Sequence, residues 1–430
     1  MTTGAANRSQ DSVQSAAYRP WQIRIFIATF LTYFGYYFCR KPFYVAKATI
    51  SGELGLTAVD LAQLGTAYLV AYMLGQFSSA YFGRKLGPRM LLLAGMGLSI
   101  VCGAAFGMSN GLMTLMLFIS VNGLAQGTGW PGCIGSLAFW FRRRQRGRVL
   151  GVWSTCYQVG SIAATSFASF VLAAWGWRWS FYSGSLVLLA IWLIVLALHP
   201  NRPEDVGLPE LSDDDTEPGN PAPQTETIGW DRKVVMTIAM MGLIYFCIKF
   251  LRYALWSWLP YFLNKNFSMS VDNAGYLSTI FDICGFVGVI ASGFVSDTIF
   301  KGRRAMVSLV MLVLMTVSFL IMYLLGSANL LVFAVSIGFA GFMLFGPDSL
   351  LSGVGAIDVG SRRGALSAAG IINGMGSIGP IFQEQIIGRM YEHYDKDLLP
   401  VLIMLVFVAA ASACLMFVLW IMSRKGIANL

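Results

Sequence analysis

The chain has 430 residues, of which 56% are hydrophobic and 12% are charged. Charged residues make up about 25% of an ordinary soluble domain, so the composition excludes a water-soluble globular protein. The formal net charge of +9 admits a nucleic-acid partner, but only the positions of the basic residues can decide that question.

The apolar residues come in repeated runs of about 20, the length of a helix that crosses the hydrocarbon core of a bilayer. We count twelve such spans, which begin near residues 23, 61, 90, 111, 148, 178, 234, 273, 305, 328, 363 and 398. The polar N-terminal segment has no apolar core of a cleavable signal peptide, so the first span itself is expected to direct insertion. The sequence therefore predicts an all-α polytopic membrane protein with twelve transmembrane helices.

Basic residues alternate sharply between the connections. The basic clusters are Arg84, Lys85 and Arg89; Arg142, Arg143, Arg144, Arg146 and Arg148; Lys301, Arg303 and Arg304; Arg362 and Arg363; and Arg424 and Lys425. Because basic loops stay on the cytoplasmic side of a membrane, we expect both termini in the cytoplasm. The basic surplus thus sets topology, and no nucleic-acid partner is expected.

A polar, acidic and proline-containing stretch near the middle of the chain is typical of a flexible linker. We predict five parts: a cytoplasmic tail (1–22), a six-helix bundle (23–200), a cytoplasmic linker (201–232), a second six-helix bundle (233–423) and a second cytoplasmic tail (424–430).

The two predicted halves share a pattern. Tyr33 precedes Arg40 by the same interval at which Tyr245 precedes Arg252. Further matches in the same order are Val59-Asp60 with Val271-Asp272, and Gly160-Ser161-Ile162 with Gly376-Ser377-Ile378. A duplicated six-span unit explains this order. Two such units related by a pseudo-two-fold axis, with a binding site at the midplane, resemble the plan of major facilitator transporters.

Cations lie inside the predicted spans, where charge is expensive. Lys249 and Arg252 interrupt the seventh span, and Arg40 with Lys41 interrupts the first. An unpaired arginine at mid-membrane costs roughly 2.5 kcal/mol or more. Snorkelling to the interface is the alternative for Arg40, but the repeat pairs it with Arg252. Such a pair calls for an anion, and guanidinium groups bind phosphate or carboxylate through two parallel hydrogen bonds. A dicarboxylate or sulfate satisfies the same pattern.

Other polar side chains accompany these cations. Tyr33 and Tyr37 share the helix face of Arg40 and can donate to the same anion, although tyrosines also form interfacial belts. Asp282 lies near the middle of the eighth span, where it is expected to pair with Lys249 or Arg252, the alternative being a proton relay. For Glu384 we expect a rim or helix-packing position, and for Asp348 a structural role.

No motif in the sequence indicates an enzyme or an ATP-driven transporter. The seven cysteines fall in apolar runs without CxxC spacing, and two histidines are too few for a metal cluster. No phosphate-binding loop and no nucleophilic triad is visible. We therefore expect no metal, no cofactor and no enzymatic activity, and the energy for any transport must come from a gradient or from exchange.

Five motifs carry a family resemblance. They are Tyr36-Tyr37-Phe38-Cys39-Arg40-Lys41, the segment 122–131 (Asn-Gly-Leu-Ala-Gln-Gly-Thr-Gly-Trp-Pro), the segment 203–208, the segment 281–286, and Phe345-Gly346-Pro347. With them the chain resembles, over both halves, the organophosphate:phosphate antiporter family of the major facilitator superfamily.

The resemblance implies roles for particular residues. Arg40 and Arg252 would bind the phosphate group, with Lys249 as a third cation similar to that of the eukaryotic exchangers. The predicted substrate-binding set also includes Tyr33, Tyr37, Lys41, Tyr72, Trp130, Tyr157 and Asp282. Gln76 and Tyr157 stand where some members carry Lys and His, which leaves the organic part of the substrate open.

We therefore predict a secondary antiporter that exchanges a phosphorylated metabolite, a sugar phosphate or glycerol phosphate, for inorganic phosphate by alternating access. Two alternatives stay open: a proton-coupled organic-anion symporter that uses Asp282 or Glu384, and a non-transporting sugar-phosphate sensor of the same family. We expect a monomer in the lipid bilayer of a bacterial cytoplasmic membrane, with an organellar membrane as the alternative.

Overall fold

The computed structural model describes residues 3–141, 149–150, 152–209, 232–300, 304–327 and 329–425, without the side chains of 3–16, 80–84, 297–298 and 353–370. Within these ranges every regular element is helical, which confirms the predicted all-α fold. Ten helical stretches there are long and apolar enough to cross a membrane. The basic residues at 142–148, 301 and 303, the linker at 210–231 and the tail at 426–430 lie outside the described residues, as do the side chains of Arg84, Arg362 and Arg363.

The chain forms two compact units. Unit 1 comprises Met1–Pro42 and Ala67–Gln224, and unit 2 comprises Phe43–Thr66 and Thr225–Leu430. In this division Phe43–Thr66 groups with the C-terminal helices. The chain therefore leaves unit 1 at Pro42 and re-enters it at Ala67. The predicted boundaries of the tails, bundles and linker stay predictions.

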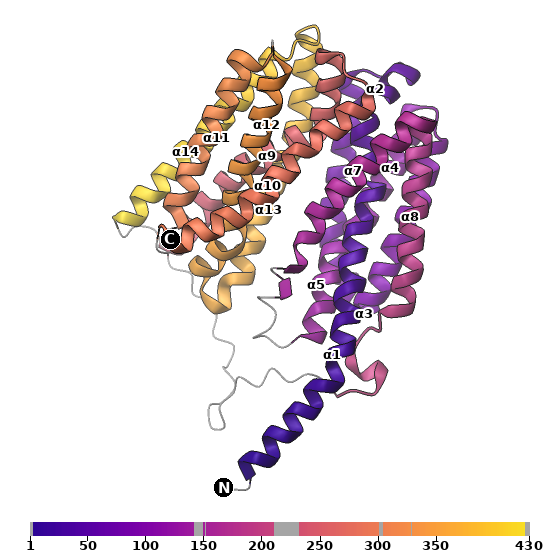
Figure 1. Cartoon of the computed structure of the whole chain (residues 1–430), viewed down its shortest axis with the longest axis vertical. Coiled ribbons are helices and arrows are strands. Elements are labelled where there is room, and N and C mark those ends of the chain that lie inside the picture. Colours follow the sequence, from indigo (N-terminus) through magenta and orange to yellow (C-terminus); the bar gives the residue numbers. More distant parts are fainter. Residues whose placement is uncertain are drawn as a thin grey trace. The chain divides into compact units, whose positions relative to one another are not determined.

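Unit 1 is a bundle of helices that run side by side (Figure 1). Its elements are α1 (Thr3–Tyr36), η1 (Tyr37–Cys39), most of α3 (Ala58–Met108), α4 (Leu112–Gln126), α5 (Gly129–Trp140), α7 (Thr155–Trp175), α8 (Trp177–Leu198) and η2 (Pro203–Val206). Helix α1 packs against α5, α7 and α8. The long α3 is two spans joined at Gly87, whose φ of 76° is a left-handed conformation that favours glycine.

Unit 2 begins with α2 (Lys41–Leu54) and the first turns of α3. Its other elements are α9 (Arg232–Phe267), α10 (Val271–Thr298), α11 (Arg304–Ile321), η3 (Met322–Gly326), α12 (Leu330–Ser349), η4 (Leu350–Gly355), α13 (Ala356–His393) and α14 (Leu399–Arg424). Helix α9 packs on α13, α10 on α12, and α11 on α14. Asn329 caps α12 by accepting from the amides of Leu331 and Val332 at 3.0 and 3.3 Å.

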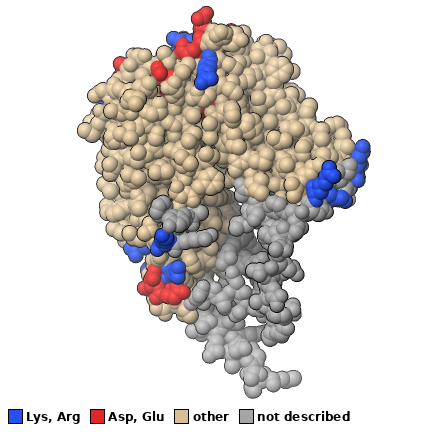
Figure 2. All heavy atoms as spheres, turned by 180° about the vertical axis from the view of Figure 1, so that it is seen from behind, with Lys and Arg blue, Asp and Glu red and all other residues tan. Residues whose placement is uncertain are grey.

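The surface agrees with a membrane environment. On the face drawn in Figure 2, charged side chains gather toward the ends of the helices, and the area between them consists almost entirely of other residues. Many large apolar side chains are exposed along the helices, among them Phe77, Leu186 and Phe294 at 70%, 62% and 68% exposure. Contact of such a surface with lipid costs little free energy, whereas its contact with water would be unfavourable.

A buried ion pair fastens α2 to the C-terminal helices of unit 2. Lys47 Nζ lies 3.3 Å from Glu384 Oε2 and donates to Ser257 Oγ at 2.8 Å, and both charged side chains are fully buried. Glu384 also accepts from the Trp258 indole at 2.8 Å and from the Ser257 hydroxyl. A Cβ on Gly65 would lie 2.9 Å from the Glu384 carboxyl carbon, so the close approach requires glycine there. Glu384 therefore lies between helices and not at a rim.

We expect removal of either partner of this pair to destabilise the protein strongly. A single Lys47→Met or Glu384→Leu change leaves a buried charge without its counter-ion, which costs roughly 3–5 kcal/mol, whereas the double change removes both charges together. The midpoint temperature of thermal unfolding of the detergent-solubilised protein should therefore fall sharply in each single variant. In the double variant it should fall by less than the sum of the two single losses. Lys265→Met, at an exposed lysine on α9, is the control. Additive losses would contradict a buried pair.

Candidate functional site

Arg40 lies at a break between two helices. Helix α1 ends at Tyr36, the short 3-10 helix η1 ends at Cys39, and α2 begins at Lys41. The Arg40 amide donates to the Tyr37 carbonyl at 3.1 Å. Pro42 occupies the first turn of α2, where its missing N–H is not needed for a helical hydrogen bond. The break therefore places an arginine at a helix junction inside an otherwise apolar stretch.

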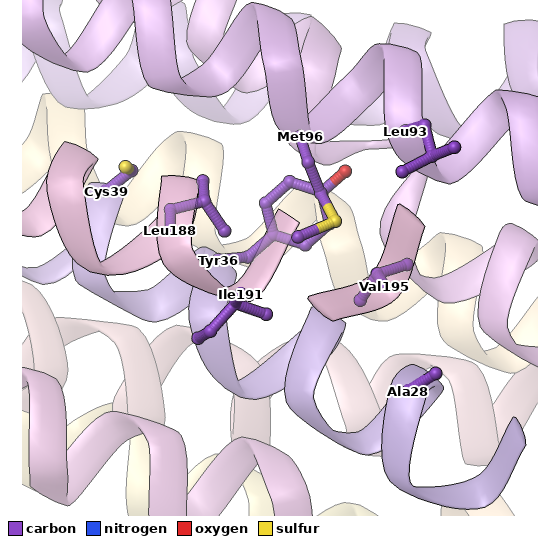
Figure 3. Close-up of a cluster of buried hydrophobic side chains, with 8 residues drawn as sticks. All are labelled: Ala28, Tyr36, Cys39, Leu93, Met96, Leu188, Ile191 and Val195. Atoms are coloured by element: carbon purple, nitrogen blue, oxygen red, sulfur yellow. The ribbon is translucent and has the colours of Figure 1, made fainter. Parts of the chain in front are cut away.

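A cluster of buried side chains holds this junction in unit 1. Tyr36 and Cys39 pack with residues of α1, α3 and α8, which are Ala28, Leu93, Met96, Leu188, Ile191 and Val195 (Figure 3). The Tyr36 hydroxyl also lies 3.0 Å from the Thr128 hydroxyl. Close packing on both sides of η1 fixes the backbone from which the Arg40 side chain starts.

The Arg40 guanidinium is enclosed by neutral groups. Its Nε donates to Gln126 Oε1 at 2.8 Å, and its Cζ lies 4.9, 5.7 and 5.0 Å from the ring centres of Tyr37, Tyr68 and Tyr72. The residue is only 6% exposed, and its Nη2 is buried without a hydrogen bond. In the described part of the chain no acidic side chain forms an ion pair with Arg40. This cation is thus buried with an unused donor.

Gln126 orients that guanidinium. Its Oε1 accepts from both Arg40 and the Tyr68 hydroxyl, the latter at 2.9 Å. Its amide nitrogen lies 3.2 Å from Asn122 Oδ1, and Asn122 in turn donates to the Cys39 carbonyl at 3.0 Å. The fully buried amide therefore ties α4 to η1 on one side and to the arginine on the other. Such a satisfied network holds a side chain in one orientation.

Gly123 in α4 and Gly127 directly after it bring the tyrosines of α3 to this network. A Cβ on Gly123 would collide with the Tyr68 carbonyl oxygen, and a Cβ on Gly127 with that of Tyr72. Small residues at this spacing let two helix backbones touch. The contact places Tyr68, Tyr72 and Gln126 together around Arg40.

Aromatic rings extend the site along unit 1. Tyr33 lies 5.6 Å from Trp130 and 6.1 Å from Tyr37, measured between ring centres, and its hydroxyl is 3.5 Å from that of Tyr72. Trp130 lies 5.5 Å from Trp153 and is the most exposed of the group at 36%. The structure thus brings five of the sequence-predicted residues together: Arg40, Tyr33, Tyr37, Tyr72 and Trp130.

Unit 2 carries its own pair of cations on α9. Arg252 Nη1 lies 3.2 Å from Asp348 Oδ2, and its Cζ is 4.8 Å from the centre of the Phe345 ring. Lys249, one turn earlier, donates to Asn373 Oδ1 at 2.6 Å and to Ser377 Oγ at 3.1 Å. One cation therefore contacts a carboxylate, and the other contacts neutral oxygens.

Three further residues of the predicted set lie at the following positions. Asp282 is buried on α10, Lys41 is the buried first residue of α2, and Tyr157 is half-buried in the first turn of α7. Their roles stay predictions, as does the pairing of Asp282 with Lys249 or Arg252.

Sequence reasoning missed several residues of these clusters. Tyr68 precedes Tyr72 by one helical turn, and Lys47 follows Arg40 inside an apolar run, so both carried a readable signal. Asp348 lacked one because its distance along the chain from α9 hides the contact with Arg252.

The comparisons with known proteins agree with this architecture. The family model of the Major Facilitator Superfamily matches residues 25–384. A probable hexose phosphate transport protein of Chlamydia pneumoniae is 26% identical and covers 87% of this chain and 86% of its own length. The glycerol-3-phosphate transporter of Bacillus subtilis is 26% identical with 90% of both chains covered. A crystal structure of a bacterial homologue of the human lysosomal transporter Spinster shares the fold, with a TM-score of 0.70, 16% identity, and 93% and 95% coverage.

The chain therefore belongs to the major facilitator superfamily and is a multi-pass membrane transporter, not an enzyme. Within the superfamily, its relatives named hexose phosphate and glycerol-3-phosphate transporters support the expected organophosphate:phosphate antiporter family.

Gln126 offers a test of how Arg40 is held. In Gln126→Glu the new carboxylate would pair with Arg40 and neutralise it, so we expect the affinity of the purified, folded protein for inorganic phosphate to fall at least tenfold. Because the change also removes the N–H groups that donate to the Tyr36 carbonyl and Asn122 Oδ1, we expect some loss of thermal stability as well. Quenching of tryptophan fluorescence measures the affinity, because Trp130 and Trp153 lie in the same cluster.

The control is Gln22→Glu, at a half-buried glutamine of α1 that donates to the Trp140 carbonyl. Unchanged phosphate affinity in Gln126→Glu would contradict the assignment of Arg40 as an anion-binding group.

Proposed function

We propose that this transporter exchanges a phosphorylated metabolite, a sugar phosphate or glycerol phosphate, for inorganic phosphate by alternating access. The observation that carries the proposal is the state of Arg40, whose guanidinium is buried, has no acidic partner in the described residues and keeps Nη2 without a hydrogen bond. A buried cation without a counter-ion is costly, so such a group calls for an anionic ligand.

The second cationic centre supports the same assignment. In the proposal Arg40 and Arg252 each supply one guanidinium to the phosphate group of the substrate, in accordance with the sequence repeat that pairs them. The planar fork of arginine matches two phosphate oxygens at once. Tyr33, Tyr37 and Tyr72 supply hydroxyl donors beside Arg40, and Trp130 supplies an apolar face for the organic part of the metabolite.

Exchange follows from the cost of moving an empty carrier. With no anion bound, conformational change carries the buried guanidinium of Arg40 without an acidic partner among the described residues, and the penalty for such a buried ion is several kcal/mol. A phosphate group bound on either side of the membrane removes that penalty and stabilises the conformations between the two end states. Each outward step therefore needs one anion and each inward step another, which is exchange.

Glu384 argues against the proton-coupled alternative in one respect. Its carboxylate is paired with Lys47 and accepts from Ser257 and Trp258, so a role in proton transfer would require these three contacts to change in each cycle. A group that carries protons must lose and regain its charge during each cycle. Asp282 remains the residue on which a proton-coupled mechanism would rest.

The cellular setting is proposed on the same basis. Cytoplasmic termini are supported by the distribution of basic residues in the sequence, and a bacterial cytoplasmic membrane by the bacterial relatives. A monomeric carrier stays a prediction.

Arginine-to-lysine substitutions test the phosphate assignment. Lysine keeps the charge but not the bidentate geometry, and a hydrogen bond to a charged group contributes about 1.5–3 kcal/mol. We therefore expect Arg40→Lys and Arg252→Lys each to lower phosphate exchange in proteoliposomes by tenfold to a hundredfold with unchanged protein levels. Arg178→Lys is the control, because Arg178 binds the carbonyls of Gly107 and Ser109. Exchange at the wild-type rate in both site variants would refute the assignment.

Preloaded proteoliposomes separate exchange from the alternatives. We expect labelled phosphate to enter vesicles that contain phosphate, glycerol 3-phosphate or a hexose phosphate, with or without a pH gradient, and not to enter empty vesicles. The preferred internal compound identifies the organic substrate. Uptake into empty vesicles driven by a pH gradient would instead support a symporter, and phosphate binding without any flux would support a sensor.

A further inference from the structure

Asp348 is an acidic residue buried beside a cation that is expected to bind substrate. It lies near the end of α12, directly after Pro347, and its side chain is only 6% exposed. Buried carboxylates stay ionised only when a positive group or several hydrogen-bond donors compensate them. Here the compensating cation is Arg252, whose Nη1 is 3.2 Å from Asp348 Oδ2.

The pair is incomplete on the side of the carboxylate. Asp348 Oδ1 is buried and makes no hydrogen bond in the described part of the chain. A strong arginine–carboxylate pair uses two parallel hydrogen bonds of about 2.7–2.9 Å, and the contact of 3.2 Å, with Asp348 Oδ1 unused among the described residues, is longer than that. The contact is therefore easy to exchange for a better acceptor.

The side chain of Arg252 is not fully enclosed. Phe345 covers one face of the guanidinium, whose side chain is 18% exposed and so more accessible than that of Asp348. The backbone carbonyl of Asp348 is bound by the Ser352 hydroxyl at 2.6 Å, so the local helix is held without help from the carboxylate. A rotation of the Asp348 side chain therefore need not disturb the backbone around it.

We propose that Asp348 is a resident counter-anion, which occupies Arg252 when no substrate is bound and is displaced from it by the phosphate group. This inference rests on the proposed function and adds to it the step by which phosphate enters and leaves. Two anions on one guanidinium repel each other, so the carboxylate and the phosphate compete. The carboxylate thereby weakens phosphate binding and provides a partner for Arg252 after release.

The two arginines then have different tasks. Arg40 is held by the neutral Gln126 amide and has no acidic side chain paired with it among the described residues, so it retains its full attraction for an anion. Arg252 has part of its charge answered by Asp348. In the proposal Arg40 attracts phosphate throughout the cycle, whereas Arg252 attracts it less when Asp348 returns to the guanidinium, and this return favours release.

The competing interpretation gives Asp348 a purely positioning role, and the two interpretations predict opposite signs. If the carboxylate only orients Arg252, its removal lets the guanidinium drift and the KM for phosphate rises. If the carboxylate competes with phosphate, its removal lowers the KM and slows release, so the maximal exchange rate falls as well.

The test is phosphate–phosphate exchange by full-length Asp348→Asn and Asp348→Ser in proteoliposomes. We expect the KM for phosphate to fall at least fivefold and the maximal rate to fall by a similar factor, with Asp395→Asn, at an exposed loop position, as the control. Two variants are used so that a folding failure of one leaves the other to be measured. A raised or unchanged KM in any folded variant overturns the proposal.

Direct binding of inorganic phosphate to the purified proteins separates this inference from the function on which it rests. Absence of phosphate binding by the wild-type protein would refute the proposed function. Binding by the wild type together with equal or weaker binding by Asp348→Asn would refute only the role of Asp348, and tighter binding by that variant supports it.

Discussion

Positive charge buried inside an apolar helical protein must find a partner, and the structure meets this requirement in three different ways. Lys47 forms an ion pair with the carboxylate of Glu384, and Lys249 donates to the neutral oxygens of Asn373 and Ser377. Arg40 donates to one amide oxygen and lies among aromatic rings. Because these partners compensate the positive charge to different degrees, the cations differ in how strongly they attract a further anion. Lys47 links helices through a buried ion pair, whereas Arg40 remains able to bind an anionic ligand.

The site of unit 1 depends on an interrupted helix. Had α1 continued through Tyr37 and Cys39 into α2, Arg40 would follow the regular helical progression of its neighbours. The turn of 3-10 helix at η1 redirects the chain, and the packing of Tyr36 and Cys39 against α3 and α8 holds that redirection in place. Backbone contacts at Gly123 and Gly127 then bring α3 close enough for its tyrosines to reach the arginine. Interruption and close approach together create a polar enclosure in an apolar bundle.

The sequence predicted the class of fold, because apolar runs of membrane-spanning length and the placement of basic residues are local signals. It also predicted Arg40, because a charge in an apolar run stands out and the internal repeat pairs it with Arg252, and it predicted Tyr33 and Tyr37 because they share the helix face of Arg40. Tyr72 and Trp130 were expected only from the family resemblance. It did not predict the contact between Arg252 and Asp348 or that between Lys47 and Glu384. These contacts join positions far apart in the chain, 96 and 337 residues in the two cases, and no local pattern encodes such a distance.

The course of the chain through its two units has a consequence for how the protein can be divided. Phe43–Thr66 belongs to unit 2, although the covalent chain on both sides of it belongs to unit 1. A polypeptide cut in the central linker would keep Lys47 on its first fragment and leave Glu384, Ser257 and Trp258 on its second. The first fragment alone would bear a lysine built for a buried partner that it lacks, and the second would bear the matching acid. The two fragments of a split gene would thus depend on each other to complete the ion pair, and in the intact chain Lys47 can reach its partner only after the eleventh predicted span has been synthesised.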